Sequence, residues 1–124
     1  MKTLAALLVA LVALLHAGFM VLEMFFWTSP FGLKTFGLTE SFAHESAVLA
    51  ANQGLYNGFL SAGLVWGLIA KHNGTGIKVF FLGCVIVAGI FGAVTAKPNI
   101  LFVQSLPALL ALLAVKLSAP RNAD

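Results

Sequence analysis

Apolar residues run along this chain in four long stretches, each separated from the next by polar or helix-breaking residues. A helix needs about 20 mostly apolar residues to cross the hydrocarbon core of a bilayer, and each stretch has about that length. The pattern therefore predicts membrane-spanning helices at about residues 3–26, 45–70, 77–96 and 99–117. We expect an all-α fold in which these helices form one antiparallel bundle, a single integral membrane domain over residues 1–124.

The residues between the predicted helices are typical of turns. Thr28-Ser29-Pro30 follows the first stretch, Asn73-Gly74 separates the second from the third, and Pro98 separates the third from the fourth. Only the first connection, at about residues 27–44, is long. Short connections place consecutive helices side by side in opposite directions, which favours the antiparallel bundle.

Composition supports a membrane location. Hydrophobic residues make up 60% of the 124 residues, and charged residues only 9%. A soluble domain typically carries ~25% charged residues, so this chain lacks the polar residues needed to cover a water-facing surface. This excludes a soluble enzyme, a nucleic-acid-binding module and a disordered tail. The one cysteine, Cys84, excludes an intrachain disulfide and a CxxC redox site.

Basic residues predict the orientation of the chain, because cytoplasmic loops are enriched in Lys and Arg. With four crossings, the two termini and the second connection lie on one side of the membrane. That side carries five basic residues, Lys2, Lys71, Lys78, Lys116 and Arg121, and the other side carries two, Lys34 and Lys97. We therefore expect both termini in the cytoplasm and the long first connection on the outer side.

Polar side chains inside the predicted spans point to function, because they are costly in lipid. His16 and Glu23 share one face of the first helix, two turns or about 10 Å apart. The second helix carries a run of amides and a phenol, and the fourth adds one amide. These groups lie in the middle or outer half of the membrane, which predicts a polar pocket open to the outer side. The candidate ligand-binding residues are His16, Glu23, Asn52, Gln53, Tyr56, Asn57 and Gln104.

The second predicted helix has two different sides. Gly54 and Gly58 form a GxxxG pair, which lets a neighbouring helix approach closely. Asn52 and Tyr56 lie on the opposite side, with Asn57 on the flank of their face. Amides of this kind also join transmembrane helices without binding any ligand, so a purely structural role is the alternative.

Four motifs in the chain resemble those of a family of small bacterial four-helix membrane proteins. The motifs are Leu22-Glu23-Met24-Phe25-Phe26-Trp27-Thr28-Ser29-Pro30, Ala51-Asn52-Gln53-Gly54-Leu55-Tyr56-Asn57-Gly58-Phe59, Phe80-Phe81-Leu82-Gly83-Cys84-Val85 with Ala88-Gly89-Ile90-Phe91-Gly92, and Gln104-Ser105-Leu106-Pro107-Ala108. The family is catalogued as a domain of unknown function, number thirteen-zero-four. The resemblance implies a bacterial inner (plasma) membrane protein and supplies no activity. The typical motif residues of the family coincide with the candidate residues above.

Two functions remain open at this point. The first is binding or transport of a small solute or lipid-like ligand, proton-coupled through Glu23; four helices are thin for a pore, so it requires a homodimer. The second is a membrane-embedded enzyme acting on a lipidic or small apolar substrate, with His16 as general acid or base and Glu23 or Glu45 as its partner. An accessory subunit without either activity is also compatible with the sequence.

We expect no cofactor, no metal and no nucleic-acid partner; the partner of the chain is the lipid bilayer. His16, Met20 and Met24 follow one another at the spacing of one helix turn, which could suit a soft metal ion. Methionine on an apolar helix is usually a packing residue, however, and we interpret these two in that way.

Overall fold

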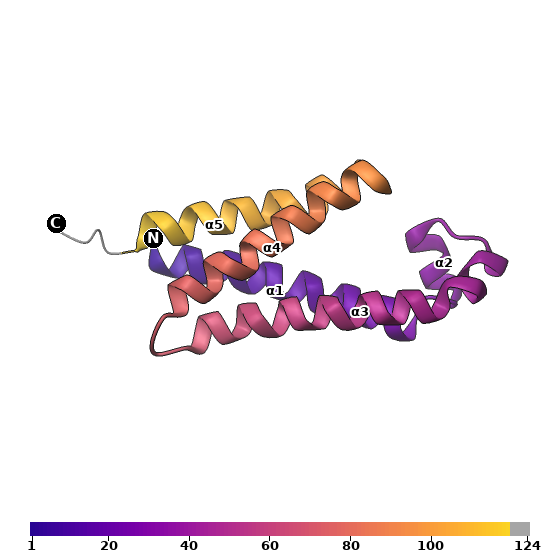
Figure 1. The fold of residues 1–124 in the computed structure, drawn as a ribbon, viewed down its shortest axis with the longest axis horizontal. Coiled ribbons are helices and arrows are strands. Elements are labelled where there is room, and N and C mark those ends of the chain that lie inside the picture. Colours follow the sequence, from indigo (N-terminus) through magenta and orange to yellow (C-terminus); the bar gives the residue numbers. More distant parts are fainter. Residues whose placement is uncertain (120–124) are drawn as a thin grey trace. The chain divides into compact units, whose positions relative to one another are not determined.

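The computed structural model describes residues 1–119, and it is helical throughout this range apart from short connections. In chain order the elements are α1 (Lys2–Phe25), α2 (Pro30–Phe36), α3 (Glu40–Ile69), α4 (Gly74–Thr95), the π-helix η1 (Leu101–Ser105) and α5 (Leu106–Ser118) (Figure 1). No strand occurs among the described residues, so the all-α prediction is confirmed. Arg121, which entered the orientation argument, lies outside the described residues.

The predicted helices correspond to α1, α3, α4 and the continuous pair η1–α5. The largest difference is at the start of α3, which begins at Glu40 rather than near residue 45. The π-turns of η1 come just before Pro107. A proline ring clashes with the carbonyl four residues before it, and a π-bulge relieves this clash by widening the turn.

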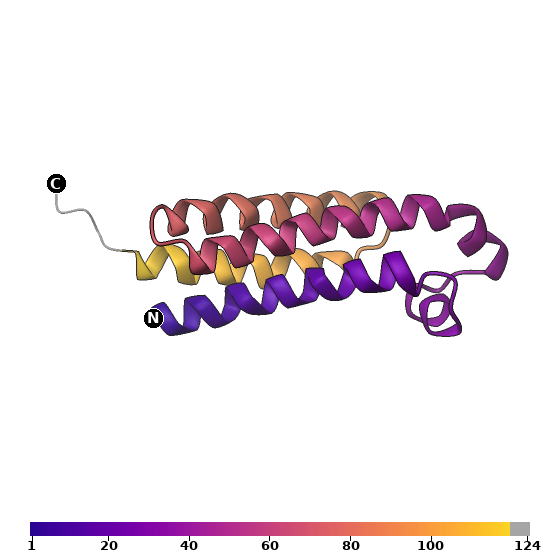
Figure 2. The ribbon, with the colours of Figure 1, turned by 90° about the horizontal axis from the view of Figure 1, so that it is seen from below.

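The short helix α2 lies inside the first connection, where the sequence analysis expected no helix. Ser29 caps its first turn, with its Oγ accepting a hydrogen bond from Gly32 N at 3.1 Å, and Pro30 occupies the first helical position. Gly37 ends the helix with a φ of 66°, in the left-handed region that favours glycine. Figure 2 shows α2 beside the end of α1. These start and stop signals are present in the sequence, but only seven residues separate them.

The described chain folds as two compact units. One, here called the hairpin unit, is Leu14–Ser61; the other, here called the α4–α5 unit, comprises residues 1–13 and 62–119. Both α1 and α3 pass from one unit to the other. The predicted single domain over residues 1–124 stays a prediction.

The hairpin unit consists of the second half of α1, α2 and the first part of α3. Gly58 of α3 lies against Met20, and Gly54 lies against Met24. Beyond the end of α1, Trp27 Nε1 donates a hydrogen bond to Ser46 Oγ at 3.0 Å. Residue numbers rise along α1 as they fall along α3, so the two helices are antiparallel.

In the α4–α5 unit, α4 runs beside η1 and α5 (Figure 1). Gly89 lies directly against Ser105, whose Oγ donates a hydrogen bond to the Ile86 carbonyl at 2.9 Å. Further along, Gly92 contacts Ile100, which makes this pair antiparallel as well. The last turns of α3 pack on α4 in the same manner. Their contacts are Gly63 with Phe81, and Gly67 with Ile77 and Lys78.

Three helical segments among the described residues are long and apolar enough to cross a membrane. They are α1, α4 and the continuous segment Leu101–Ser118, which joins η1 and α5. The longest helix, α3, is not one of them, because Asn52, Gln53 and Asn57 interrupt its apolar sequence. Hydropathy therefore supports a membrane protein and identifies three segments that are long and apolar enough to cross the bilayer.

Replacing Gly89 with Ala tests the close approach of α4 to η1. A Cβ at this position would lie 2.9 Å from the backbone N of Ser105, and the backbone cannot move aside as a flexible side chain does. We expect Gly89→Ala to lower the free energy of unfolding in detergent micelles by about 1–3 kcal/mol, the usual cost of overpacking. The measurement is denaturant unfolding followed by tryptophan fluorescence.

Gly83→Ala is the matched control on the same helix, because a Cβ there meets no atom within 4 Å. Alanine has the higher helix propensity, so this variant should be as stable as the native chain or slightly more stable. If Gly83→Ala and Gly89→Ala lower the free energy of unfolding equally, the packing of α4 on η1 is not as described.

Candidate functional site

A hydrogen bond between Glu23 and Asn57 joins the two long helices of the hairpin unit. Asn57 Nδ2 donates to Glu23 Oε2 at 2.7 Å. The Asn57 side chain is buried, with 5% of its surface exposed, and Glu23 is partly buried. The short distance is typical of a hydrogen bond to a charged acceptor. Two of the predicted site residues therefore meet in one unit.

Gly54 brings these two side chains within reach. A Cβ at Gly54 would lie 3.0 Å from the Met20 carbonyl oxygen and 3.0 Å from Glu23 Cβ, so the α3 backbone rests directly on α1. Gly58, one turn further, faces the Met20 side chain. Close helix approach at the GxxxG pair is what the sequence predicted. Because Asn57 belongs to the same buried side of α3, its amide is directed at α1.

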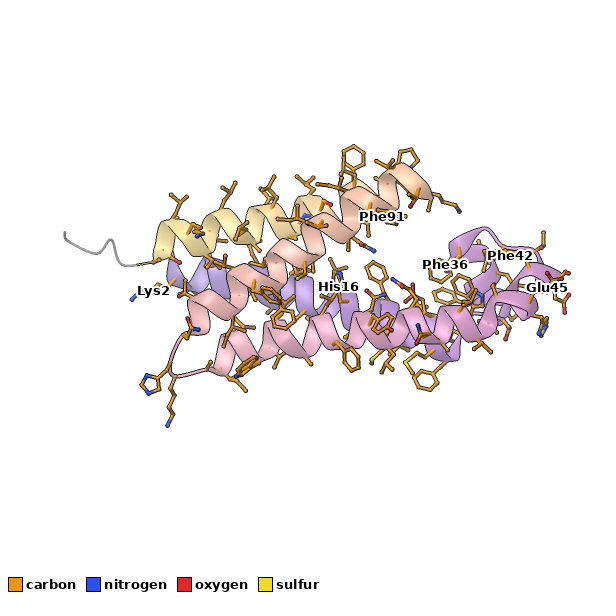
Figure 3. All side chains as sticks on the ribbon, in the orientation of Figure 1. Lys2, His16, Phe36, Phe42, Glu45 and Phe91 are labelled. Carbon is orange, nitrogen blue, oxygen red and sulfur yellow. The ribbon has the colours of Figure 1, made fainter. Side chains whose placement is uncertain are left out.

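His16 lies on α1 about two helix turns before Glu23. It is almost completely buried, with 1% of its surface exposed. Its ring meets Phe19 edge to face, with centroids 5.6 Å apart and an interplanar angle of 79°. Figure 3 labels His16 on α1. The burial gives a substrate no direct access to the imidazole. It favours a structural role for His16 over general acid–base chemistry.

The other polar residues of α3 do not join the Glu23–Asn57 pair. Asn52 and Gln53 are exposed, and Tyr56 has 52% of its surface exposed, with its ring beside Phe59 at a centroid distance of 6.1 Å. Helix geometry explains the separation, because Asn57 lies about 140° around the helix axis from Asn52. The interpretation that put Asn57 on the flank of the Asn52 face missed this division.

Gln104 belongs to the α4–α5 unit. It is partly buried in η1, next to the Ser105 that packs on Gly89. The hairpin unit therefore contains six of the seven predicted residues, and hydrogen bonding unites only Glu23 and Asn57. The binding roles of all seven stay predictions.

A second polar contact in the hairpin unit was not predicted from the sequence. Ser46 Oγ donates to the Phe42 carbonyl at 2.6 Å while it accepts the hydrogen bond from Trp27. The Trp27 ring also contacts Phe36 of α2, with centroids 4.8 Å apart. Figure 3 shows Phe36, Phe42 and Glu45 gathered at this end of the unit. A lone serine in a helix gives no signal of such a contact, because its partner is 19 residues away.

The α4–α5 unit carries two apolar grooves, and neither includes a predicted site residue. One, of about 240 Å³, lies between α4 and the η1–α5 segment, from Ile86 to Leu109. The other, of about 710 Å³, is an open groove along α4 between Val79 and Phe91. Within residues 1–119, no three His, Cys, Asp or Glu side chains come together as a metal site would require.

Replacing Gly54 with Ala tests whether the helix approach sets the site. The added Cβ meets the α1 backbone, so α1 and α3 must separate and the Glu23–Asn57 bond must lengthen or break. We expect Gly54→Ala to lower the free energy of unfolding by about 1–3 kcal/mol, measured by denaturant unfolding in micelles. Gly18→Ala on α1 is the control, because a Cβ there meets nothing within 4 Å. If Gly18→Ala lowers the free energy of unfolding as much as Gly54→Ala, close packing at Gly54 is not the cause of the effect.

Comparison with known proteins adds the family. The family model described as "Protein of unknown function (DUF1304)" matches residues 10–116, a range that includes every predicted site residue. The chain belongs to this family. The resemblance found in the sequence motifs is thereby confirmed.

A curated relative of this DUF1304 chain is the "Uncharacterized protein YpaA" of Lactococcus lactis subsp. lactis (strain IL1403). It is 30% identical over 116 residues, which cover 92% of this chain and 98% of the relative. No solved structure matches the chain. Neither the family description nor the name of the relative states an activity.

Proposed function

We propose that this DUF1304 protein crosses the bacterial inner (plasma) membrane four times, with both termini in the cytoplasm. Three apolar segments support crossings at α1, α4 and η1–α5. The contacts of α3 make it antiparallel to α1 in the hairpin unit and antiparallel to α4 in the α4–α5 unit. A helix that runs antiparallel to two membrane-spanning neighbours spans the same bilayer. The distribution of basic residues supports the orientation.

Helix lengths support a location of the Glu23–Asn57 pair in the outer half of the membrane. Asn57 is separated from the end of α3 at Ile69 by about 18 Å along the axis, at 1.5 Å per residue. Glu23 is separated from the start of α1 at Lys2 by about 31 Å. The two side chains are hydrogen-bonded and so lie at one depth, and the two counts bound that depth. With a hydrocarbon core about 30 Å thick, these bounds run from just beyond its middle to its outer edge.

We propose that Glu23 and Asn57 form the centre of a binding site for a small cationic solute, which the protein carries in exchange for protons. The observation behind this proposal is a carboxylate held at 2.7 Å by a buried amide between apolar helices. Among the described residues no cationic side chain neutralises it, and its Oε1 accepts no hydrogen bond. In surroundings of low polarity such a carboxylate needs a counter-charge, and either a proton or a bound cation supplies one. Competition between the two is the basis of exchange.

The enzyme alternative has less support. It requires His16 to reach a substrate, and His16 is 1% exposed. Glu23 differs from His16 because it is only partly buried. A solute therefore has a shorter route to the carboxylate than to the imidazole.

Flux through liposomes tests the proposal. The full chain is purified, reconstituted with a pH-sensitive dye in the lumen, and exposed to an outward or inward gradient of tetraethylammonium or ethidium. We expect the cation gradient to drive an opposite proton movement that protein-free liposomes lack. Proteoliposomes that stay as tight as protein-free ones toward both cations and protons would overturn the proposal.

A further inference from the structure

The dipeptide Asn-Gly occurs twice in the chain, at Asn57-Gly58 and at Asn73-Gly74. In this dipeptide the backbone nitrogen of the glycine can attack the side-chain carboxamide of the asparagine, because glycine has no Cβ to hinder the approach. The attack closes a succinimide ring. It requires a backbone N–H outside any hydrogen bond and a carboxamide that is free to turn toward it.

The local structure of Asn73-Gly74 meets both requirements. Asn73 lies in the connection between α3 and α4 (Figure 1), in the left-handed region with a φ of 55°, and its side chain does not cap the helix that follows. Gly74 is the first residue of α4, and the first N–H groups of a helix have no partner within the helix. Among the described residues, Gly74 N donates no backbone hydrogen bond either.

The position of this turn also supplies water. Lys71 and His72 come directly before Asn73, and the apolar segment of α4 begins directly after it. Charged side chains are costly in the hydrocarbon core, so the turn lies at the end of the apolar segment, in contact with water.

The local structure of Asn57-Gly58 meets neither requirement. Both residues lie inside α3, where the Gly58 N–H belongs to the hydrogen bonding of the helix. The Asn57 carboxamide is buried, and its Nδ2 donates the 2.7 Å hydrogen bond to Glu23 Oε2. This carboxamide cannot turn toward Gly58 N until its hydrogen bond breaks and α3 unwinds locally.

We propose that Asn73 is a site of spontaneous deamidation in the folded protein, and that α3 and Glu23 protect Asn57 from the same reaction. Gly74 N forms a bond to Asn73 Cγ, and the carboxamide nitrogen leaves as ammonia with the proton that Gly74 N loses. Water then adds to either carbonyl carbon of the succinimide and opens the ring, which gives aspartate or isoaspartate. Water is the one co-reactant, and nothing is oxidised or reduced. The inference does not rest on the transport function.

The two products change the start of α4 in different ways. Aspartate places a carboxylate directly before the first turn of α4, where the helix dipole favours negative charge. Isoaspartate also adds a methylene group to the main chain and therefore displaces Gly74. Little room exists there, because a Cβ at Gly74 would lie 2.8 Å from the Gly67 carbonyl oxygen. Isoaspartate should therefore disturb the packing of α4 on the end of α3.

Incubation in heavy-oxygen water tests the proposal. The full chain in detergent micelles is kept in this water at mildly alkaline pH, digested at acid pH, and analysed by mass spectrometry of its peptides. Ring opening adds a heavy oxygen atom, so the label marks only the deamidation that occurs during incubation. We expect the Asn73 peptide to gain label at least about 10-fold faster than the Asn57 peptide, because Asn57 must first break a hydrogen bond to a charged group.

Two controls separate the effect of structure from that of sequence. In denaturant that abolishes the helical circular dichroism, the two peptides should gain label at similar rates, because the dipeptide is the same. Asn73→Gly removes the carboxamide and keeps a residue that accepts the left-handed backbone, so its peptide should gain no label at this position. In the folded chain, an Asn73 peptide labelled no faster than the Asn57 peptide would overturn the proposal. A difference of the same size in denaturant would also overturn it.

Discussion

Glu23→Gln should reduce cation-driven proton movement in proteoliposomes to the level of protein-free vesicles. Glutamine has nearly the same shape as glutamate, and its side-chain oxygen can still accept the hydrogen bond from Asn57 Nδ2. The substitution removes the negative charge and the titratable proton and leaves the packing of α1 on α3 in place. A loss of flux would therefore report on the charge and not on the fold.

Two other carboxylates provide matched controls. Glu40 and Glu45 are exposed at the start of α3, outside the proposed site. Glu40→Gln and Glu45→Gln remove the same charge from the same chain and should keep the flux of the native protein. If Glu23→Gln keeps native flux, or if the controls lose it equally, Glu23 is not the coupling residue.

Asn57→Leu should lower the free energy of unfolding by about 1.5–3 kcal/mol, the range for hydrogen bonds to a charged group. Leucine has a similar volume, so the main change is the loss of the donor to Glu23, which is left without a partner in a partly buried position. The measurement is denaturant unfolding in micelles. Gln53→Leu replaces an exposed amide on the same helix and should change the stability by no more than about 0.5 kcal/mol.

A double-mutant cycle isolates the contribution of the pair. If the bond accounts for the effect, Asn57→Leu should cost less stability in a Glu23→Gln background than in the native chain, because a neutral amide left unpaired costs less than a carboxylate. Equal losses in both backgrounds would show that Asn57 acts through packing and not through Glu23.

The flux and stability results together distinguish a binding site from a structural contact. A site predicts that Glu23→Gln abolishes flux while it leaves most of the stability. A structural contact predicts that Asn57→Leu and Glu23→Gln both lower the stability while native flux is absent or independent of the charge. The GxxxG contact at Gly54 is common to both cases, because either function needs α1 and α3 at this distance.

The two sides of α3 were predicted from the sequence only in part. Gly54 and Gly58 were predicted to face a neighbouring helix, and they lie against Met20 and Met24 of α1. The same helical periodicity predicted one polar face, yet the structure buries Asn57 and exposes Asn52. Helical periodicity predicts which side chains point in the same direction. Whether a residue at the edge of a face is buried depends on the helix that packs there.

The sequence by itself determined the four long helical segments of this protein. Long apolar stretches, Pro, Gly and Asn at the breaks, and scarce charge are local properties, and a helix is the local structure that satisfies every backbone hydrogen bond in lipid. It did not determine which polar residues meet. The pairing of Glu23 with Asn57, residues separated by 34 positions, depends on the rotation and depth at which α1 rests on α3. That arrangement follows from non-local packing at Gly54, where no Cβ holds the two backbones apart.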